Sequence, residues 1–75
     1  MDQLEERLLR ELSGGEQLTA DDLANRIDAR DWVELSTPLS QLASTGYVTV
    51  VGPLGRATTC YRIHPQGRAA LDRAT

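Results

Sequence analysis

Leucines recur with the spacing of one helix face at the beginning of the chain, and charged residues fill the positions between them. The apolar positions are Leu4, Leu8, Leu9 and Leu12. A repeat of three to four residues predicts an amphipathic helix over about residues 2–12, with the leucines on its buried side. Gly14 and Gly15 follow at once, and this pair predicts that the helix ends there in a turn.

A second helix is predicted after a short extended link at Gln17-Leu18. The segment Thr19-Ala20-Asp21-Asp22 places an N-cap residue three positions before an acid, which is the pattern of a capping box. We expect the helix to begin there and to end near residues 28–30. Its buried face is supplied by Leu23, Ala24 and Ile27.

A third helix is predicted from Asp31 to Thr45, with Pro38 as its irregular feature. Its apolar positions continue the helical spacing through Leu35, Leu39, Leu42 and Ala43. Proline removes a backbone donor and clashes with the preceding turn, so we expect one helix kinked at Pro38. The alternative is a short turn over residues 31–35 followed by a helix that Ser36 or Thr37 caps, with Pro38 in its first turn.

Beyond Gly46 the helical spacing gives way to alternation and to β-branched residues. Residues 47–51 and 58–63 predict two strands of a hairpin, joined by a turn at Gly52-Pro53-Leu54-Gly55. Pro65 then opens a short last helix that extends through Leu71. The order of elements predicts an α+β fold, mainly helical, in which three helices precede a two-stranded wing and a closing helix.

Length and composition restrict this chain to a small globular unit. It has 75 residues, of which 40% are hydrophobic and 25% charged, and we expect a single domain over residues 1–75. Aromatic residues are few and phenylalanine is absent, so the core must consist of leucine, valine, isoleucine and alanine. A core this small leaves little surplus stability, which favours a partner subunit; we expect a homodimer.

Three segments resemble those of bacterial winged-helix regulators of the MarR and PadR kind. They are Thr19–Ala24, similar to the second helix of such proteins; Leu39–Val48, similar to the end of their recognition helix; and Tyr61–Leu71, similar to their second wing strand and following helix. The resemblance covers nearly the whole chain and implies a winged helix-turn-helix fold. It also implies a small transcription regulator that binds double-stranded DNA and comes from a bacterium or a phage. Every basic side chain is arginine, a bias associated with GC-rich genomes of such sources.

The resemblance implies a DNA-binding surface on the third helix and the wing. Carried over position by position, the DNA-binding residues are Ser36, Thr37, Ser40, Gln41 and Ser44 on the helix and Arg56 and Arg62 on the wing. Glutamine can contact adenine through two hydrogen bonds, and arginine suits a narrow minor groove. The predicted helix departs from the usual pattern because it carries no arginine or lysine, because Glu34 lies where its carboxylate would repel phosphate, and because Pro38 bends the reading surface.

Charge leaves a second function open. The net charge is −3, with ten acidic residues and four arginines before residue 36 and one acidic residue and four arginines after it. An acidic protein has little non-specific affinity for nucleic acid. The alternative is therefore a winged-helix module that binds a regulator, polymerase or nuclease instead of DNA. Its candidate interface residues are Asp21, Asp22, Asp28, Asp31 and Trp32. Each of these acids can also be a helix cap or part of a solvated face, and Trp32 can also be a core residue.

Catalytic and cofactor chemistry find little support in the sequence. Cys60 and His64 stand four positions apart without a second pair of ligands, so we expect no metal site and no cofactor. We expect Cys60 to be a buried or half-buried thiol and His64 to cap the last helix. No enzyme activity is expected. The chain also lacks an apolar run of the roughly 20 residues that a membrane span needs, so we expect a cytoplasmic protein without membrane contact.

Overall fold

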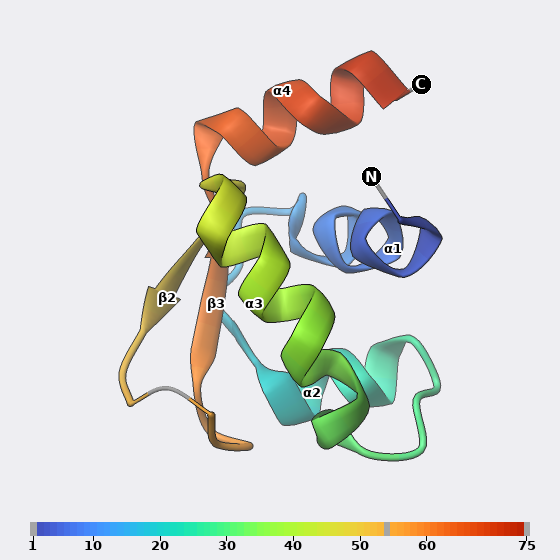
Figure 1. The fold of residues 1–75 in the computed structure, drawn as a ribbon, viewed down its shortest axis with the longest axis vertical. Coiled ribbons are helices and arrows are strands. Elements are labelled where there is room, and N and C mark those ends of the chain that lie inside the picture. The colour runs from blue at the N-terminus through green and yellow to red at the C-terminus, as the bar shows by residue number, and fades with distance from the viewer. Residues whose placement is uncertain (1, 54, 75) are drawn as a thin grey trace.

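The computed structural model describes residues 2–53 and 55–74. Four α-helices, one short 3-10 helix and three strands follow one another along the chain (Figure 1). Their bounds are α1 Gln3–Leu12, β1 Leu18–Thr19, α2 Ala20–Arg26, η1 Trp32–Leu35, α3 Ser36–Thr45, β2 Val48–Val51, β3 Cys60–Ile63 and α4 Pro65–Ala74. This arrangement confirms the predicted α+β class and its order of helices, hairpin and closing helix.

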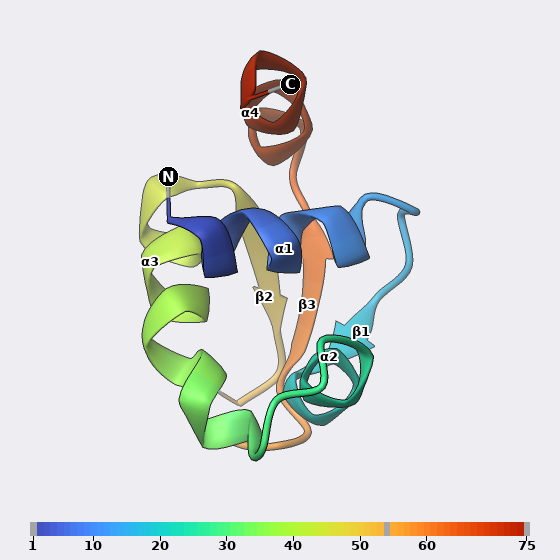
Figure 2. The ribbon, with the colours of Figure 1, turned by 90° about the vertical axis from the view of Figure 1, so that its right-hand side faces the viewer.

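Helix α1 is the amphipathic helix that the leucine spacing predicts. The Asp2 side chain accepts a hydrogen bond from the amide of Leu4 at 3.4 Å and so caps its N-terminus. Leu8, Leu9 and Leu12 are fully buried. They belong to one hydrophobic cluster that also takes in leucines of α2 and α3 and side chains of the sheet, so α1 lies across the centre of the fold (Figure 2).

The sheet has a third strand that the sequence analysis treated as an extended link. Strand β1 pairs antiparallel with β3, and the strand order is β1-β3-β2. Leu18 pairs with Tyr61 across this ladder, and both side chains face the core. Two residues are too few to show the alternation that marks a strand. Only the tertiary position beside β3 therefore makes this segment a strand.

Helix α2 begins with the predicted capping box and is attached to the hairpin. The hydroxyl of Thr19 accepts from the amide of Asp22 at 3.0 Å, and the Asp22 carboxylate accepts from the amide of Thr19 at 3.2 Å. The next free amides of the helix, those of Ala20 and Asp21, donate to the carbonyls of Thr59 and Ala57 at 3.0 and 3.1 Å. The hairpin thus satisfies helix donors that would otherwise lack partners.

The third helical segment is divided, which corrects the prediction of one kinked helix from Asp31. A 3-10 turn, η1, precedes α3, and Pro38 lies in the first turn of α3, where its missing amide removes no helical hydrogen bond. The proposed caps were also wrong. Leu35 occupies the N-cap position without a side-chain hydrogen bond, and the Ser36 hydroxyl donates backward to the carbonyl of Val33 at 2.9 Å.

A glycine turn connects α3 to the hairpin. Gly46 has a φ of 86°, and the amide of Tyr47 returns to the carbonyl of Leu42 at 2.9 Å, which ends the helix and starts β2. Strands β2 and β3 pair from Val48 with Ile63 to Val51 with Cys60. Both strands are shorter than predicted. Leu54, in the predicted turn, lies outside the described residues.

Helix α4 closes the fold against α1 (Figures 1 and 2). The Nδ1 atom of His64 accepts from the amide of Gln66 at 3.1 Å, so His64 caps this helix as predicted. An ideal Cβ placed on Gly67 would lie 2.2 Å from the carbonyl oxygen of Tyr47. The absence of a side chain at Gly67 is therefore what allows the helix to approach the turn after α3 so closely.

Candidate functional site

Helix α3 presents a polar stripe on the side opposite its buried leucines. Thr37, Ser40, Gln41 and Ser44 are all exposed, whereas Leu39 and Leu42 are at most 1% exposed. Residues three and four positions apart lie on one helix face, so these four side chains form a continuous outward row. We call them the α3 stripe. Ser36, the fifth predicted helix residue, is also exposed and lies at the N-terminal end, on the side toward the hairpin.

The side chains of the α3 stripe make no hydrogen bond to any other described residue. Two neighbouring hydroxyls are occupied instead: that of Thr45 donates to the carbonyl of Gln41 at 2.7 Å, and that of Ser36 is engaged with Val33. The row therefore offers hydroxyl and amide groups that are free to bond to a partner. It is uncharged, and Glu34, next to it, directs its carboxylate to the amide of Arg30 at 3.2 Å.

Arg56 lies in the segment that joins the two strands of the hairpin. Its side chain is exposed, and no ion pair holds it within the described part of the chain. Its backbone is held firmly, because the amide of Arg56 donates to the hydroxyl of Thr59 at 3.0 Å and its carbonyl accepts from the amide of Thr59 at 3.1 Å. The Thr59 hydroxyl in turn donates to the carbonyl of Pro53.

Thr59 was not recognised in the sequence as a structural residue of the wing. It was predicted to be part of the returning strand, but it precedes β3 and is completely buried. A threonine beside a turn is too common to carry a signal of this role. Its importance comes from two contacts with residues three and six positions earlier, which the sequence does not show.

Arg62 lies on a different surface from the α3 stripe. Tyr61 and Ile63 face the core, so alternation along β3 turns Arg62 to the outer face of the sheet. There it borders an open hollow of about 470 Å³ together with Arg68 of α4 and the loop at Gly15. The structure thus brings the five predicted helix residues together and leaves Arg62 apart from them.

The acidic residues proposed for a protein interface are exposed, but two of them have structural roles. Asp22 belongs to the capping box of α2, and Asp31 accepts from the amide of Val33 at 3.3 Å and caps η1. Asp21 and Asp28 are exposed without a side-chain bond to another described residue. Trp32 is half-buried and packs against the core cluster. Its exposure is therefore intermediate between the core residue and the exposed interface residue that the sequence analysis considered.

Ion pairs hold two arginines in the acidic first half of the chain. Arg10 pairs with Glu6 at 2.7 Å, and Arg26 approaches Glu16 and Glu11 at 3.4 and 3.9 Å. These pairs neutralise cations on α1 and α2, whereas no ion pair neutralises Arg56 or Arg62 within the described residues. The hairpin therefore carries two arginines whose charge is available to a partner.

The two residues considered for metal or nucleophilic chemistry have structural surroundings. Cys60 is half-buried, as predicted, and its Sγ lies 3.6 Å from the carbonyl oxygen of Thr58. His64 uses Nδ1 to cap α4. Residues 2–53 and 55–74 contain no cluster of three or more histidine, cysteine, aspartate or glutamate side chains placed to hold a metal ion. Among the same residues, no helix is both long enough and apolar enough to cross a bilayer.

Comparison with solved structures identifies transcription regulators with the same fold. The transcriptional regulator BldR from Sulfolobus solfataricus matches 99% of this chain with a TM-score of 0.84 and 24% identity, over 52% of its own length. A MarR-family regulator from Silicibacter pomeroyi matches 97% with a TM-score of 0.82 and 25% identity, over 49% of its length. The adhesin competence repressor AdcR from Streptococcus pyogenes matches 97% with a TM-score of 0.79 and 16% identity, over 54%.

The fold is therefore a winged helix resembling that of MarR-type regulators, as the sequence resemblance implies. The chain spans about half the length of each of these three regulators. No family model and no curated protein matches the sequence itself. The likeness is thus one of structure.

Proposed function

We propose that this chain is a DNA-binding module of a transcription regulator. The observation that carries the proposal is the α3 stripe, a row of exposed polar side chains on the helix that winged-helix proteins insert into the major groove. These side chains have no hydrogen-bonding partner among the described residues. The three regulators with the same fold support it. The proposal assigns no catalytic role and no cofactor to the chain.

The residues of the α3 stripe differ in what they can read. The Gln41 amide has a donor and an acceptor and can bond to adenine in two places, which makes it the proposed base-reading residue. The hydroxyls of Thr37, Ser40 and Ser44 can bond to bases or phosphates. We assign Arg56 to the DNA backbone at the minor groove, because the hairpin projects beside α3 (Figure 1) and Arg56 forms no ion pair with another described residue.

Arg62 is proposed to act through its charge rather than by direct contact. It lies on the outer face of the sheet, near Arg68, where it raises the local positive potential. Since few cations serve the interface, sequence-specific contacts must supply an unusually large share of the binding free energy. We further propose that the chain forms a homodimer, because two copies double the phosphate contacts and suit a palindromic operator. The proposed source is a bacterium or a phage.

An NMR footprint tests this assignment. The labelled protein is titrated with a duplex from the region upstream of its own gene, and amide shifts are compared with those that a scrambled duplex causes. We expect the largest shifts at Thr37–Ser44 and Gly55–Ala57. The protein-binding alternative would instead be supported if DNA caused no shifts, and if a polymerase, regulator or nuclease from the same organism caused shifts at Asp21, Asp28 and Trp32.

A further inference from the structure

Strand β2 forms an open edge of the sheet. The strand order β1-β3-β2 places a neighbour on one side of β2 only, and no other described element lies beyond its free side (Figure 1). The opposite edge, β1, has only two residues. A free edge presents backbone groups that can pair with a further strand, so β2 is the longer of the two edges open to such pairing.

The register of the hairpin decides which backbone groups face this edge. The amide of His64 donates to the carbonyl of Tyr47 at 3.0 Å, which makes these two residues a hydrogen-bonded pair of the β2–β3 ladder. Hydrogen-bonded and non-hydrogen-bonded pairs alternate along antiparallel strands. The amides and carbonyls of Val48 and Val50 therefore point away from β3 and make no hydrogen bond to another described residue.

Strand β2 lacks the features that normally protect an edge from pairing. Such edges usually carry a charged residue, a proline or a bulge. Residues 47–55 contain no charged side chain, the strand Val48–Val51 contains no proline, and its register with β3 is continuous. All four residues of the strand are β-branched, which favours extended structure. Val51, at its end, is 38% exposed.

We propose that β2 pairs antiparallel with β2 of a second copy of this chain. In the register that we assign, Val48 of each copy faces Val50 of the other, and each facing pair exchanges both of its hydrogen bonds. The outward amides and carbonyls are then satisfied. Thr49 lies on the two-fold axis opposite Thr49 of the second copy, with the two Cα atoms about 4.5 Å apart. Both copies thus use the same strand, as a two-fold interface requires.

A second copy suits this edge for reasons of side chains and of charge. The register places threonine against threonine and valine against valine, and such cross-strand pairs stabilise sheets. The acid-rich helices α1 and α2 lie on the other side of the molecule from the free edge (Figure 1). Two copies that approach through the uncharged β2 therefore keep their acidic surfaces apart, which limits the repulsion between two chains of net charge −3.

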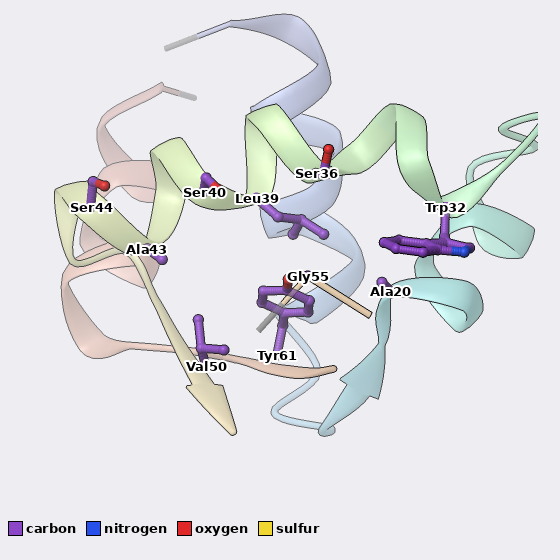
Figure 3. Close-up of a pocket in the computed structure, with 10 residues that line it drawn as sticks. All are labelled: Ala20, Trp32, Ser36, Leu39, Ser40, Ala43, Ser44, Val50, Gly55 and Tyr61. Carbon is purple, nitrogen blue, oxygen red and sulfur yellow. The ribbon is translucent and has the colours of Figure 1, made fainter. Parts of the chain in front are cut away.

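The pairing also determines where the two α3 helices lie. The two-fold axis of an antiparallel strand pair is perpendicular to the sheet, so both core faces of the joined sheet point to the same side. Figure 3 shows Val50 directed toward α3, and Ser40 and Ser44 directed away from β2. Both α3 stripes are therefore exposed on one side of the dimer.

This inference names the interface of the homodimer proposed above, and its relevance to DNA rests on that proposed function. The pairing itself is measured without DNA, so failure of the pairing and failure of DNA binding are separate results. Four residues per copy make a small contact, well below the roughly 1,200 Å² of a stable interface. We expect a dissociation constant on the order of 1 mM in the absence of DNA.

The first test is a dilution series of the isotope-labelled chain that spans this dissociation constant, followed by proton–nitrogen NMR. We expect the largest concentration-dependent shifts at the amides of Val48 and Val50. Thr49→Lys places two like charges directly opposite each other and should weaken self-association at least tenfold. Thr58→Lys adds the same charge at an exposed position before β3 and should leave self-association unchanged.

Disulfide formation tests the register. Thr49→Cys, in a Cys60→Ser background that removes the native thiol, brings two thiols together across the axis at a spacing that a disulfide accepts. Val51→Cys in the same background lies on the same face of β2 but two positions from the axis. In a glutathione buffer we expect at least tenfold more cross-linked dimer from Thr49→Cys than from Val51→Cys.

Circular dichroism melts establish that each variant is folded before it is measured. The proposal would be overturned by the absence of concentration-dependent shifts at Val48 and Val50, or by shifts centred on α1 and α4. Equal effects of Thr49→Lys and Thr58→Lys would overturn it as well. If Thr49→Lys does not fold, the disulfide result decides, and equal cross-linking at positions 49 and 51 rejects the assigned pairing.

Discussion

The buried hydroxyl of Thr59 accepts a hydrogen bond from the backbone amide of Arg56 at 3.0 Å and donates one to the carbonyl of Pro53. One side chain therefore connects both ends of the hairpin loop. The carbonyl of Thr59 accepts from Ala20 at the start of α2, which attaches the same residue to the helical core. The position of Arg56 relative to α3 thus depends on Thr59, which is completely buried and cannot itself contact DNA.

Replacing Thr59 with valine is expected to loosen the wing while preserving its shape and volume. The change leaves the amide of Arg56 and the carbonyl of Pro53 without their partner, at a cost of about 1–3 kcal/mol in the free energy of unfolding. Chemical denaturation measures this loss. We also expect weaker DNA binding, although Arg56 itself is unchanged.

Thr58→Val is the matched control, because Thr58 is exposed and its hydroxyl makes no hydrogen bond to another described residue. It should change stability by less than about 0.5 kcal/mol. Equal stability of the Thr58 and Thr59 variants would contradict the role assigned to the buried hydroxyl.

Gly67→Ala is expected to lower the stability of the folded protein strongly, although it adds only one carbon atom. A Cβ at Gly67 would lie 2.2 Å from the carbonyl oxygen of Tyr47 and 3.2 Å from a methyl group of Leu9, so α4 must shift away from α1. Such crowding costs about 1–3 kcal/mol or more. Gly14→Ala has no atom within 4 Å of the added carbon and should leave the midpoint of thermal unfolding nearly unchanged. Similar midpoints for the two variants would show that α4 does not pack as described.

Stability is expected to fall in alkaline solution because of Tyr61. Burial raises the pKa of this hydroxyl above 10.0, so the folded protein retains a proton that the unfolded chain releases. The contribution of the protonated Tyr61 to the free energy of unfolding is complete below pH 10, and it is lost as the pH rises through the folded-state pKa.

Near-ultraviolet absorbance of a Tyr47→Phe variant follows this ionisation, since the chain has two tyrosines and Tyr61 is then alone. The free energy of unfolding should decline above pH 10 in this variant. It should decline less when Tyr61 is also replaced by phenylalanine. A midpoint at or below 10.0 for the folded variant would contradict the burial of this side chain.

Gln41→Ala and Arg56→Ala should weaken DNA binding in different ways. Loss of the Gln41 amide is expected to relax preference at one base pair, with about 1–3 kcal/mol less discrimination there. Loss of Arg56 should weaken binding to all sequences and reduce the slope of log K against log salt by about one.

Arg68→Ala removes the same charge from α4 and serves as the control for Arg56. Titration against a set of single-base operator variants distinguishes these patterns. A uniform loss for Gln41→Ala, or equal effects of the Arg56 and Arg68 variants, would contradict the assignment.

Much of the fold was predictable because its signals are local. The Thr19–Asp22 capping box and the leucines of α1 involve residues within one or two helical turns of each other, and both predictions are confirmed. Strand β1 was missed since its two residues become a strand only by pairing with β3. The division at Ser36 was the alternative and not the preferred prediction, because Pro38 is compatible with a kink or with a first turn, and packing decides between them.

The site shows the same difference between local and tertiary information. Helical spacing placed the α3 stripe on one face, whereas the prediction grouped Arg62 with these residues and did not use the alternation along Tyr61–Ile63, which turns Arg62 to the outer face of the sheet. The side-chain hydrogen bonds of Thr59 are made within an irregular loop, and its carbonyl contact with Ala20 joins segments far apart in the sequence. No periodicity within a single element carries information about them.

A salt-dependent fluorescence-anisotropy titration with DNA from upstream of the protein's own gene tests the central claim most directly. We predict binding that is stronger than to a scrambled duplex of equal length, with a slope of log K against log salt of about −2 to −4 for the few arginines available to phosphates. Equal binding to both duplexes, or no change in anisotropy even at low salt, would contradict a DNA-reading role for the α3 stripe.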